Sequence, residues 1–296
     1  MPTIMKFVNN LIYKTPKIPK ALYIEPTNYC NLKCVMCYHR HESPRTEGFM
    51  DFDMFKIIIN DASEFGIKSV ALQMAGEPLL HPRLIDMIKY AKEKKLNIGF
   101  STNVTLLDEK MINEILGSGL DRIIFAVDGN CSETYQSIRV GGNYDRVCEN
   151  IIQFIKSRNE TDYYEYNSPT VTLQTIVMKK TENEVPKLIE KWSRIVDNII
   201  LTSVYEYDGL TELHPFDIDN LSKRIPCDHL FKRPEIVVLW NGDITVCCQD
   251  LLGKLVIEIF QILGVLRVHG IQRNSICYES STGTVNFVRH VHTVRI

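Results

Sequence analysis

The sequence has little net charge, no long apolar run and no signal-peptide pattern in its first residues, and each absence argues against a class of partner or location. The formal net charge is −2 over 296 residues, which gives no sign of a nucleic-acid or membrane-surface partner. No apolar run approaches the ~18 residues of a membrane span, since the longest carries Glu258 and Arg267. Residues 1–20 are basic but lack the apolar core and cleavage site of a signal peptide. We therefore expect a cytoplasmic protein with neither a nucleic acid nor a membrane as partner.

The end of the chain lacks three common residue types. Lysine, aspartate and proline are absent after Lys254, although all three are frequent before it. We hypothesise that residues 254–296 form an atypical tail, truncated or frameshifted relative to an ancestral protein. The alternative is a divergent tail that folds normally. Translation of the encoding DNA in the other frames tests the hypothesis, which fails if no cysteine-rich continuation is found.

Three of the nine cysteines lie within eight positions, at Cys30, Cys34 and Cys37. In a reducing compartment, clustered cysteines more often bind metals or act in redox chemistry than form disulfides. A cubane [4Fe–4S] cluster is usually held by four thiolates, so three leave one iron open to a small molecule. A zinc site closed by His39 or His41 is an alternative, as is an ordinary thiol loop.

Strand-like and helix-like segments alternate from about residue 20 to 207. The strand-like runs are short and mostly apolar, at 21–27, 69–76, 97–103, 122–129, 170–178 and 198–207. Helix-like segments lie at 50–65, 81–94, 108–119, 144–157 and 182–196. This succession predicts a parallel sheet, because each parallel connection needs a crossover. An open six-unit barrel and a doubly wound sheet both fit, and both gather functional groups at the carboxyl ends of the strands.

A second unit follows a polar stretch at 210–226. It begins at Cys227 and contains the runs "EIVVLW" and "DITVCC", which flank Asn241 and Gly242. An Asn-Gly pair between two apolar runs predicts a β-hairpin with a type I′ turn.

Four motifs together resemble the radical S-adenosylmethionine (radical SAM) family. In that family C-x3-C-x2-C lies in the loop after the first strand. Here "AGEP" at 75–78 resembles the family's Gly-Gly-Glu-Pro motif, and "STN" at 101–103 resembles its third-strand segment. The run "AVDGNCSETYQSIRVGGNYDRVCENI" resembles the stretch after the fourth strand. The resemblance implies an α/β fold, a partial (β/α)6 TIM-like barrel with a small C-terminal extension containing a β-hairpin.

The resemblance also implies the cofactors and their ligands. A [4Fe–4S] cluster would be held by Cys30, Cys34 and Cys37, with S-adenosylmethionine on its open iron. The residues implied to bind S-adenosylmethionine are Ala75, Gly76, Glu77, Pro78, Ser101, Asn103 and Arg139. The backbone of 76–78 would receive the amino group, and the side chains would bind the ribose hydroxyls or the carboxylate, which suits the arginine fork.

In the same way, the resemblance implies the reaction and its partners. An electron donor such as flavodoxin or ferredoxin would drive reductive cleavage of S-adenosylmethionine, and the resulting radical would abstract hydrogen from a substrate C–H bond. An oxidoreductase or maturase acting on a carbohydrate-like small molecule or a peptide is expected. The alternative is a non-catalytic iron–sulfur or zinc-binding protein, a degenerate family member.

Cys227 and Cys247 resemble the start of the family's SPASM or twitch extension, which binds auxiliary [4Fe–4S] clusters. With Cys277 they supply three thiols, one fewer than such a cluster usually takes. The expected organisation is an N-terminal extension at 1–19, a radical SAM core at 20–209, the start of the extension at 210–253 and the tail at 254–296.

Overall fold

The computed structural model describes residues 21–37, 45–160, 168–203 and 235–259, apart from residues 246, 249 and 255. Several predictions fall outside the described residues: the N-terminal extension, His39, His41, Cys227, Cys277 and most of the tail. In the part that is described, no helix combines the length and apolar character needed to cross a membrane.

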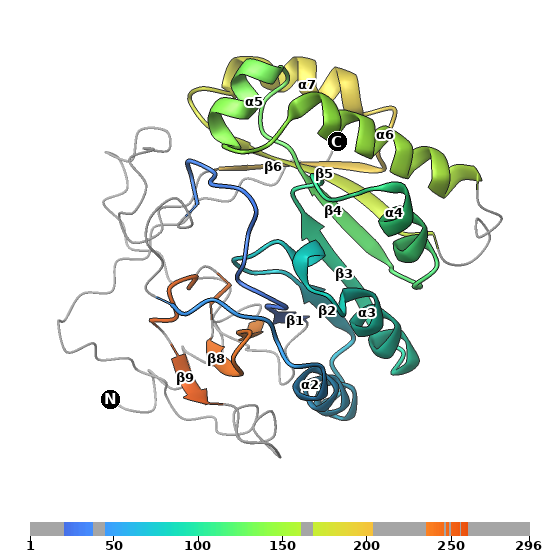
Figure 1. Cartoon of the computed structure of the whole chain (residues 1–296), viewed down its shortest axis with the longest axis vertical. Helices are drawn as coiled ribbons and strands as arrows, with labels where there is room; N and C mark the ends of the chain where they lie inside the picture. The colour runs from blue at the N-terminus through green and yellow to red at the C-terminus, as the bar shows by residue number, and fades with distance from the viewer. Residues whose placement is uncertain are drawn as a thin grey trace, which may run out of the picture.

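One sheet organises the described residues, with helices packed along it (Figure 1). Its first six strands are parallel and lie side by side in chain order. They are β1 (Ala21–Ile24), β2 (Ser69–Leu72), β3 (Asn97–Thr102), β4 (Arg122–Ala126), β5 (Thr170–Val177) and β6 (Asn198–Ser203). A doubly wound sheet needs a reversal of strand order. This unbroken order instead matches the predicted open, partial barrel.

The C-terminal unit extends the same sheet beyond β1. Strand β7 (Glu235–Val238) pairs parallel with β1, while β8 (Asp243–Thr245) and β9 (Val256–Ile259) continue in antiparallel pairing. The predicted hairpin is confirmed, but its turn type was wrong. Gly242 has φ 92° while Asn241 does not have a positive φ, and Gly242 N–H donates to Leu239 O. This is a three-residue loop closed by a left-handed glycine, whereas type I′ needs two residues with positive φ.

Helices follow most strands and begin where the sequence offers caps. They are α2 (Phe52–Phe65), α3 (Leu84–Glu93), α4 (Glu109–Leu116), α5 (Ser132–Ile138), α6 (Tyr144–Glu160) and α7 (Val185–Trp192), with short 3-10 turns η2 (Pro78–Leu80) and η4 (Glu182–Glu184). The Asp51 carboxylate accepts from two backbone N–H groups of α2, and Asp108 caps α4 in the same way. Gly66, with φ 91°, ends α2. The sequence did not predict α5.

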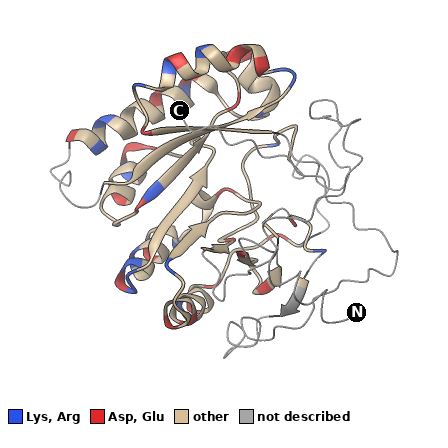
Figure 2. Ribbon diagram, turned by 180° about the vertical axis from the view of Figure 1, so that it is seen from behind, with Lys and Arg blue, Asp and Glu red and all other residues tan. Residues whose placement is uncertain are grey.

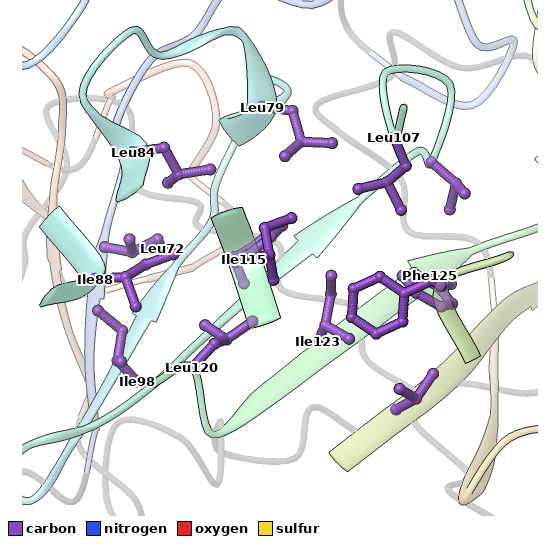
Figure 3. Close-up of a cluster of buried hydrophobic side chains, with 14 of the residues drawn as sticks. Leu72, Leu79, Leu84, Ile88, Ile98, Leu107, Ile115, Leu120, Ile123 and Phe125 are labelled. Atoms are coloured by element: carbon purple, nitrogen blue, oxygen red, sulfur yellow. The ribbon is translucent and has the colours of Figure 1, made fainter. Parts of the chain in front are cut away.

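The main core lies between the sheet and the helices. Leu72, Ile98, Ile123 and Phe125 project from neighbouring strands toward helix residues such as Ile115 (Figure 3). Charged side chains lie mainly on the helices and loops, while the strands are largely uncharged (Figure 2). Each buried aliphatic or aromatic side chain contributes about 1.5–3 kcal/mol. This packing gives the carboxyl edge of the sheet a rigid base.

Candidate functional site

The loop with the three cysteines is fixed at the carboxyl end of β1. Leu32, Cys34 and Met36 alternate into an apolar cluster with Ile138 and Met178. Two hydrogen bonds, from Lys33 N to Val140 O and from Val35 N to Ile138 O, both at 2.9 Å, tie the loop to the segment around the end of α5. A further bond from Cys37 N to Cys34 O closes a turn between the last two cysteines. The loop is thus ordered by backbone pairing and apolar burial.

The three thiols of the loop share a largely buried environment. All three are thiols outside any disulfide, with Cys34 buried and Cys30 and Cys37 half-buried. Burial raises the pKa of Cys30 to about 12 and also raises that of Cys34, so thiolates need a compensating cation. In the described residues, no three His, Cys, Asp or Glu side chains are arranged around one metal position. A cubane needs no such convergence, since each thiolate binds a different iron.

Arg139 lies beside the loop with the three cysteines, and Asp128 holds its side chain in place. Its Nε donates to Asp128 Oδ2 at 2.7 Å, and both side chains are buried. The other carboxylate oxygen accepts from Ile176 N at 2.6 Å. The positive charge of Arg139 also lowers the pKa of Cys34, against the larger effect of burial. The structure thus places Asp128 as the partner of Arg139.

Gly76 and Glu77 lie directly against the start of the cysteine loop. Glu77 N donates to Tyr29 O at 2.8 Å. A Cβ at Gly76 would lie 2.3 Å from Thr27 O and 2.6 Å from Tyr29 O, so glycine is required by close approach of two backbones. Ala75 has no left-handed backbone, since only Lys95 and Val104 among described non-glycine residues have positive φ. The backbone at this position therefore accommodates alanine where the family motif has glycine.

Glu77 and Asn103 connect β2 and β3 to the cysteine loop. The Glu77 carboxylate accepts from Leu79 N at 3.1 Å and from Asn103 N at 2.7 Å. The Asn103 amide donates to Asn31 Oδ1 at 2.9 Å, and its Nδ2 lies 4.0 Å from Cys30 Sγ. Thr105 donates to the Asn103 oxygen. The Asn103 amide is therefore engaged in positioning the loop.

Ser101, Pro78 and Cys247 are the remaining predicted site residues that the structure describes. Ser101 is half-buried near the carboxyl end of β3, and Pro78 is the buried first residue of η2. Cys247 is half-buried in the turn after β8. The sequence missed Asn31 and Thr105, whose side chains meet from distant loops where Asn31 Nδ2 donates to Thr105 Oγ1 at 2.8 Å. It also missed the pairing of Asp128 with Arg139.

Glu77 gives the fold a pH dependence. Its pKa is raised to about 7 because burial opposes its charge more strongly than its hydrogen bonds support it. A folded-state pKa above the unfolded value stabilises the fold below about pH 4.5, and this contribution is lost as the pH rises through about 7. Relative to Glu77→Gln, the wild-type unfolding free energy should fall by roughly 3 kcal/mol across this range. Urea unfolding of the cluster-free proteins checks this, and parallel pH profiles would contradict it.

Comparison with known proteins identifies the family of the chain. The family profile of the radical SAM superfamily matches residues 24–192. A tungsten-containing aldehyde ferredoxin oxidoreductase cofactor-modifying protein of Pyrococcus furiosus is 29% identical over 263 residues, covering 78% of this chain and 72% of that protein. A probable GTP 3′,8-cyclase of Methanococcus maripaludis is 26% identical over 217 residues, covering 72% and 69% respectively.

Two solved structures share the fold. Streptococcus suis SuiB bound to S-adenosylmethionine has a TM-score of 0.69 at 16% identity, covering 92% of this chain and 70% of that one. The enzyme anSMEcpe with bound AdoMet has a TM-score of 0.61 at 16% identity, covering 83% and 79%. At these identities the structures support the fold, while the family profile spans more than half of the chain. The chain belongs to the radical SAM superfamily, which uses a [4Fe–4S] cluster and S-adenosylmethionine to start its chemistry.

Proposed function

We propose that this protein abstracts a hydrogen atom from a C–H bond of a small polar molecule, as a radical SAM enzyme of the SPASM or twitch group. The observation that carries the proposal is the loop of three thiols against Gly76 and Glu77. The substrate class is supported by the two curated relatives, whose names refer to a cofactor and to GTP. These names favour a carbohydrate-like or nucleotide-like substrate over a peptide.

The proposed chemistry comes from the cofactors. Held by Cys30, Cys34 and Cys37, a [4Fe–4S] cluster would supply the electron for reductive cleavage of S-adenosylmethionine to methionine, and the 5′-deoxyadenosyl group would remove a hydrogen atom from substrate. The protein supplies orientation and a water-poor cavity. A low-potential protein such as flavodoxin or ferredoxin is the proposed electron donor.

Each part of the site has a proposed role. Cys30, Cys34 and Cys37 would hold three irons and leave the fourth for S-adenosylmethionine. The backbone at 75–78 would receive its amino group, and Ser101 would bind a ribose hydroxyl. Arg139 would pair with its carboxylate through the guanidinium that Asp128 fixes by Nε at 2.7 Å. Asn103 would act through the cysteine loop, since its amide already bonds Asn31.

Release of 5′-deoxyadenosine tests the proposed function. The protein is reconstituted with iron and sulfide under anaerobic conditions, reduced, and mixed with S-adenosylmethionine. We expect 5′-deoxyadenosine and methionine in equal amounts, with more turnover when the correct substrate is added. A protein that binds iron but never releases 5′-deoxyadenosine would instead support the non-catalytic alternative, and a colourless zinc protein would contradict the assignment altogether.

The iron content tests the auxiliary site proposed from Cys227 and Cys247. A standard auxiliary cluster needs four ligands, and Cys247 is the described member of that pair, half-buried after β8. We expect the core cluster alone, with about four irons per chain, and no change in that number for Cys247→Ser. A count near twice that value, falling on Cys247→Ser, would establish the auxiliary cluster.

A further inference from the structure

A turn of the C-terminal unit lies against the candidate cofactor site. Leu251 is 5% exposed and forms an apolar cluster with Ala75. Cys37, Met74 and Leu252 pack against the same cluster. Cys37 is the last cysteine of the three-thiol loop, and Ala75 opens the AGEP motif. A leucine far along the chain is therefore part of an apolar cluster that joins the AGEP motif to the cysteine loop.

The turn that carries Leu251 is well defined by its own hydrogen bonds. Asp250 N donates to Cys247 O at 3.0 Å, and Gly253 N donates to Asp250 O at 3.2 Å. The buried Asp250 carboxylate accepts from Thr245 Oγ1 at 2.9 Å and from Lys254 N at 2.8 Å. Gly253, with φ 65°, allows the chain to reverse there. The polar groups of the turn are thus bonded within it, and Leu251 projects from a fixed position.

The turn is also attached firmly to the core. Strand β7 pairs with β1 from Ala21 to Ile24. At the end of β1, the fully buried Glu25 accepts from Arg45 Nη2 at 2.7 Å and from Trp240 N at 3.2 Å, and it also accepts from the backbone of Ala75. Trp240 Nε1 bonds Thr46 O at 3.2 Å. One carboxylate therefore joins the C-terminal hairpin, the AGEP motif and the segment that returns from the cysteine loop.

From these contacts we infer that Leu251 is a positioning residue of the cofactor site. Its side chain covers the iron–sulfur cluster on the side of Cys37 and keeps water away from that side. The inference rests on the proposed function, because it concerns the cluster held by the three thiols. Groups around a metal's ligands control solvent access and reduction potential. Water beside Cys37 would stabilise the more negatively charged reduced cluster and speed the loss of iron.

The contact is tested first in the cluster-free protein. Under reducing conditions, alkylation of each cysteine by iodoacetamide is followed by mass spectrometry. Leu251→Ser should raise the rate at Cys37 several-fold and leave Cys34 unchanged, because Cys34 packs against Ile138 and Met178 instead. Leu251→Ala, which only shortens the side chain, should also raise the alkylation rate of Cys37, but by a smaller factor. Equal acceleration of both cysteines, or of neither, would overturn the inference.

The function of the contact is tested in the cluster-loaded protein. Iron release to a coloured chelator should be about tenfold faster in Leu251→Ser than in wild type, and the cluster's midpoint potential should shift upward. Leu116→Ser is the matched control, since Leu116 is 9% exposed and lies at the end of α4 that leads into β4, away from the cysteine loop. Equal release from both variants and wild type would overturn the inference alone. A wild-type protein that takes up no cluster would overturn the proposed function as well.

Discussion

Cys34→Ala is expected to remove both the iron–sulfur cluster and the cleavage of S-adenosylmethionine. Cys34 is 6% exposed and sits between the Arg139 guanidinium and the apolar cluster of Ile138 and Met178. With two thiolates left, the protein cannot hold three irons of a cubane. We expect at least ~100-fold less 5′-deoxyadenosine, measured with iron content on the same sample.

Cys148→Ala provides the matched control. Cys148 is 8% exposed in α6 and belongs to the main apolar core, so it shares residue type, substitution and burial with Cys34. It should keep the cluster and the cleavage of S-adenosylmethionine. If Cys34→Ala retained iron and activity while Cys148→Ala lost them, the site would have been assigned to the wrong cysteines.

Gly76→Ala is expected to damage the cofactor site through the backbone. The added Cβ would lie 2.3 Å from Thr27 O and 2.6 Å from Tyr29 O, both in the segment that follows β1, so either the AGEP segment or the cysteine loop must move. Overpacking of this kind costs typically about 1–3 kcal/mol. Because Glu77 N would lose its bond to Tyr29 O, we expect S-adenosylmethionine affinity to fall by about 10–100-fold.

Equilibrium dialysis of the cluster-loaded protein against S-adenosylmethionine measures this affinity without turnover. Gly117→Ala is the control, because Gly117 has φ −80° and an added Cβ would come only to 3.3 Å from its nearest neighbour. The control should bind like the wild type. Unchanged affinity in Gly76→Ala would show that the backbone approach has no part in cofactor binding.

The alternating strands and helices were predictable because their signals are local. The runs ending in Ile24 and Leu72 are mostly apolar and bounded by polar residues, so the chain itself marks these strands. The predicted helix-like segment at 144–157 lies within α6, where Val147 and Ile151 are buried at helical spacing. Because functional groups follow the strand ends in such sheets, the sequence alone predicts the thiols, AGEP and Asn103 at one edge.

The missed features depend on contacts between distant segments. Helix α5 has only seven residues and no side-chain cap, so its sequence carries little helical signal. The addition of β7 to β1, the Asp128–Arg139 pair and the apolar cluster of Leu251 with Ala75 each join residues that the sequence keeps apart. Periodicity reports which face of an element is buried, and it does not report which partner covers that face.

The central claim is that three protein thiolates leave one iron of the cluster for S-adenosylmethionine. Mössbauer spectra of protein reconstituted with ⁵⁷Fe, recorded with and without the cofactor, test it most directly. We expect that adding S-adenosylmethionine changes the signal of roughly one quarter of the iron. This quarter is the single iron site that has no cysteine ligand. Spectra in which all iron sites are equivalent and unaffected by the cofactor would contradict it.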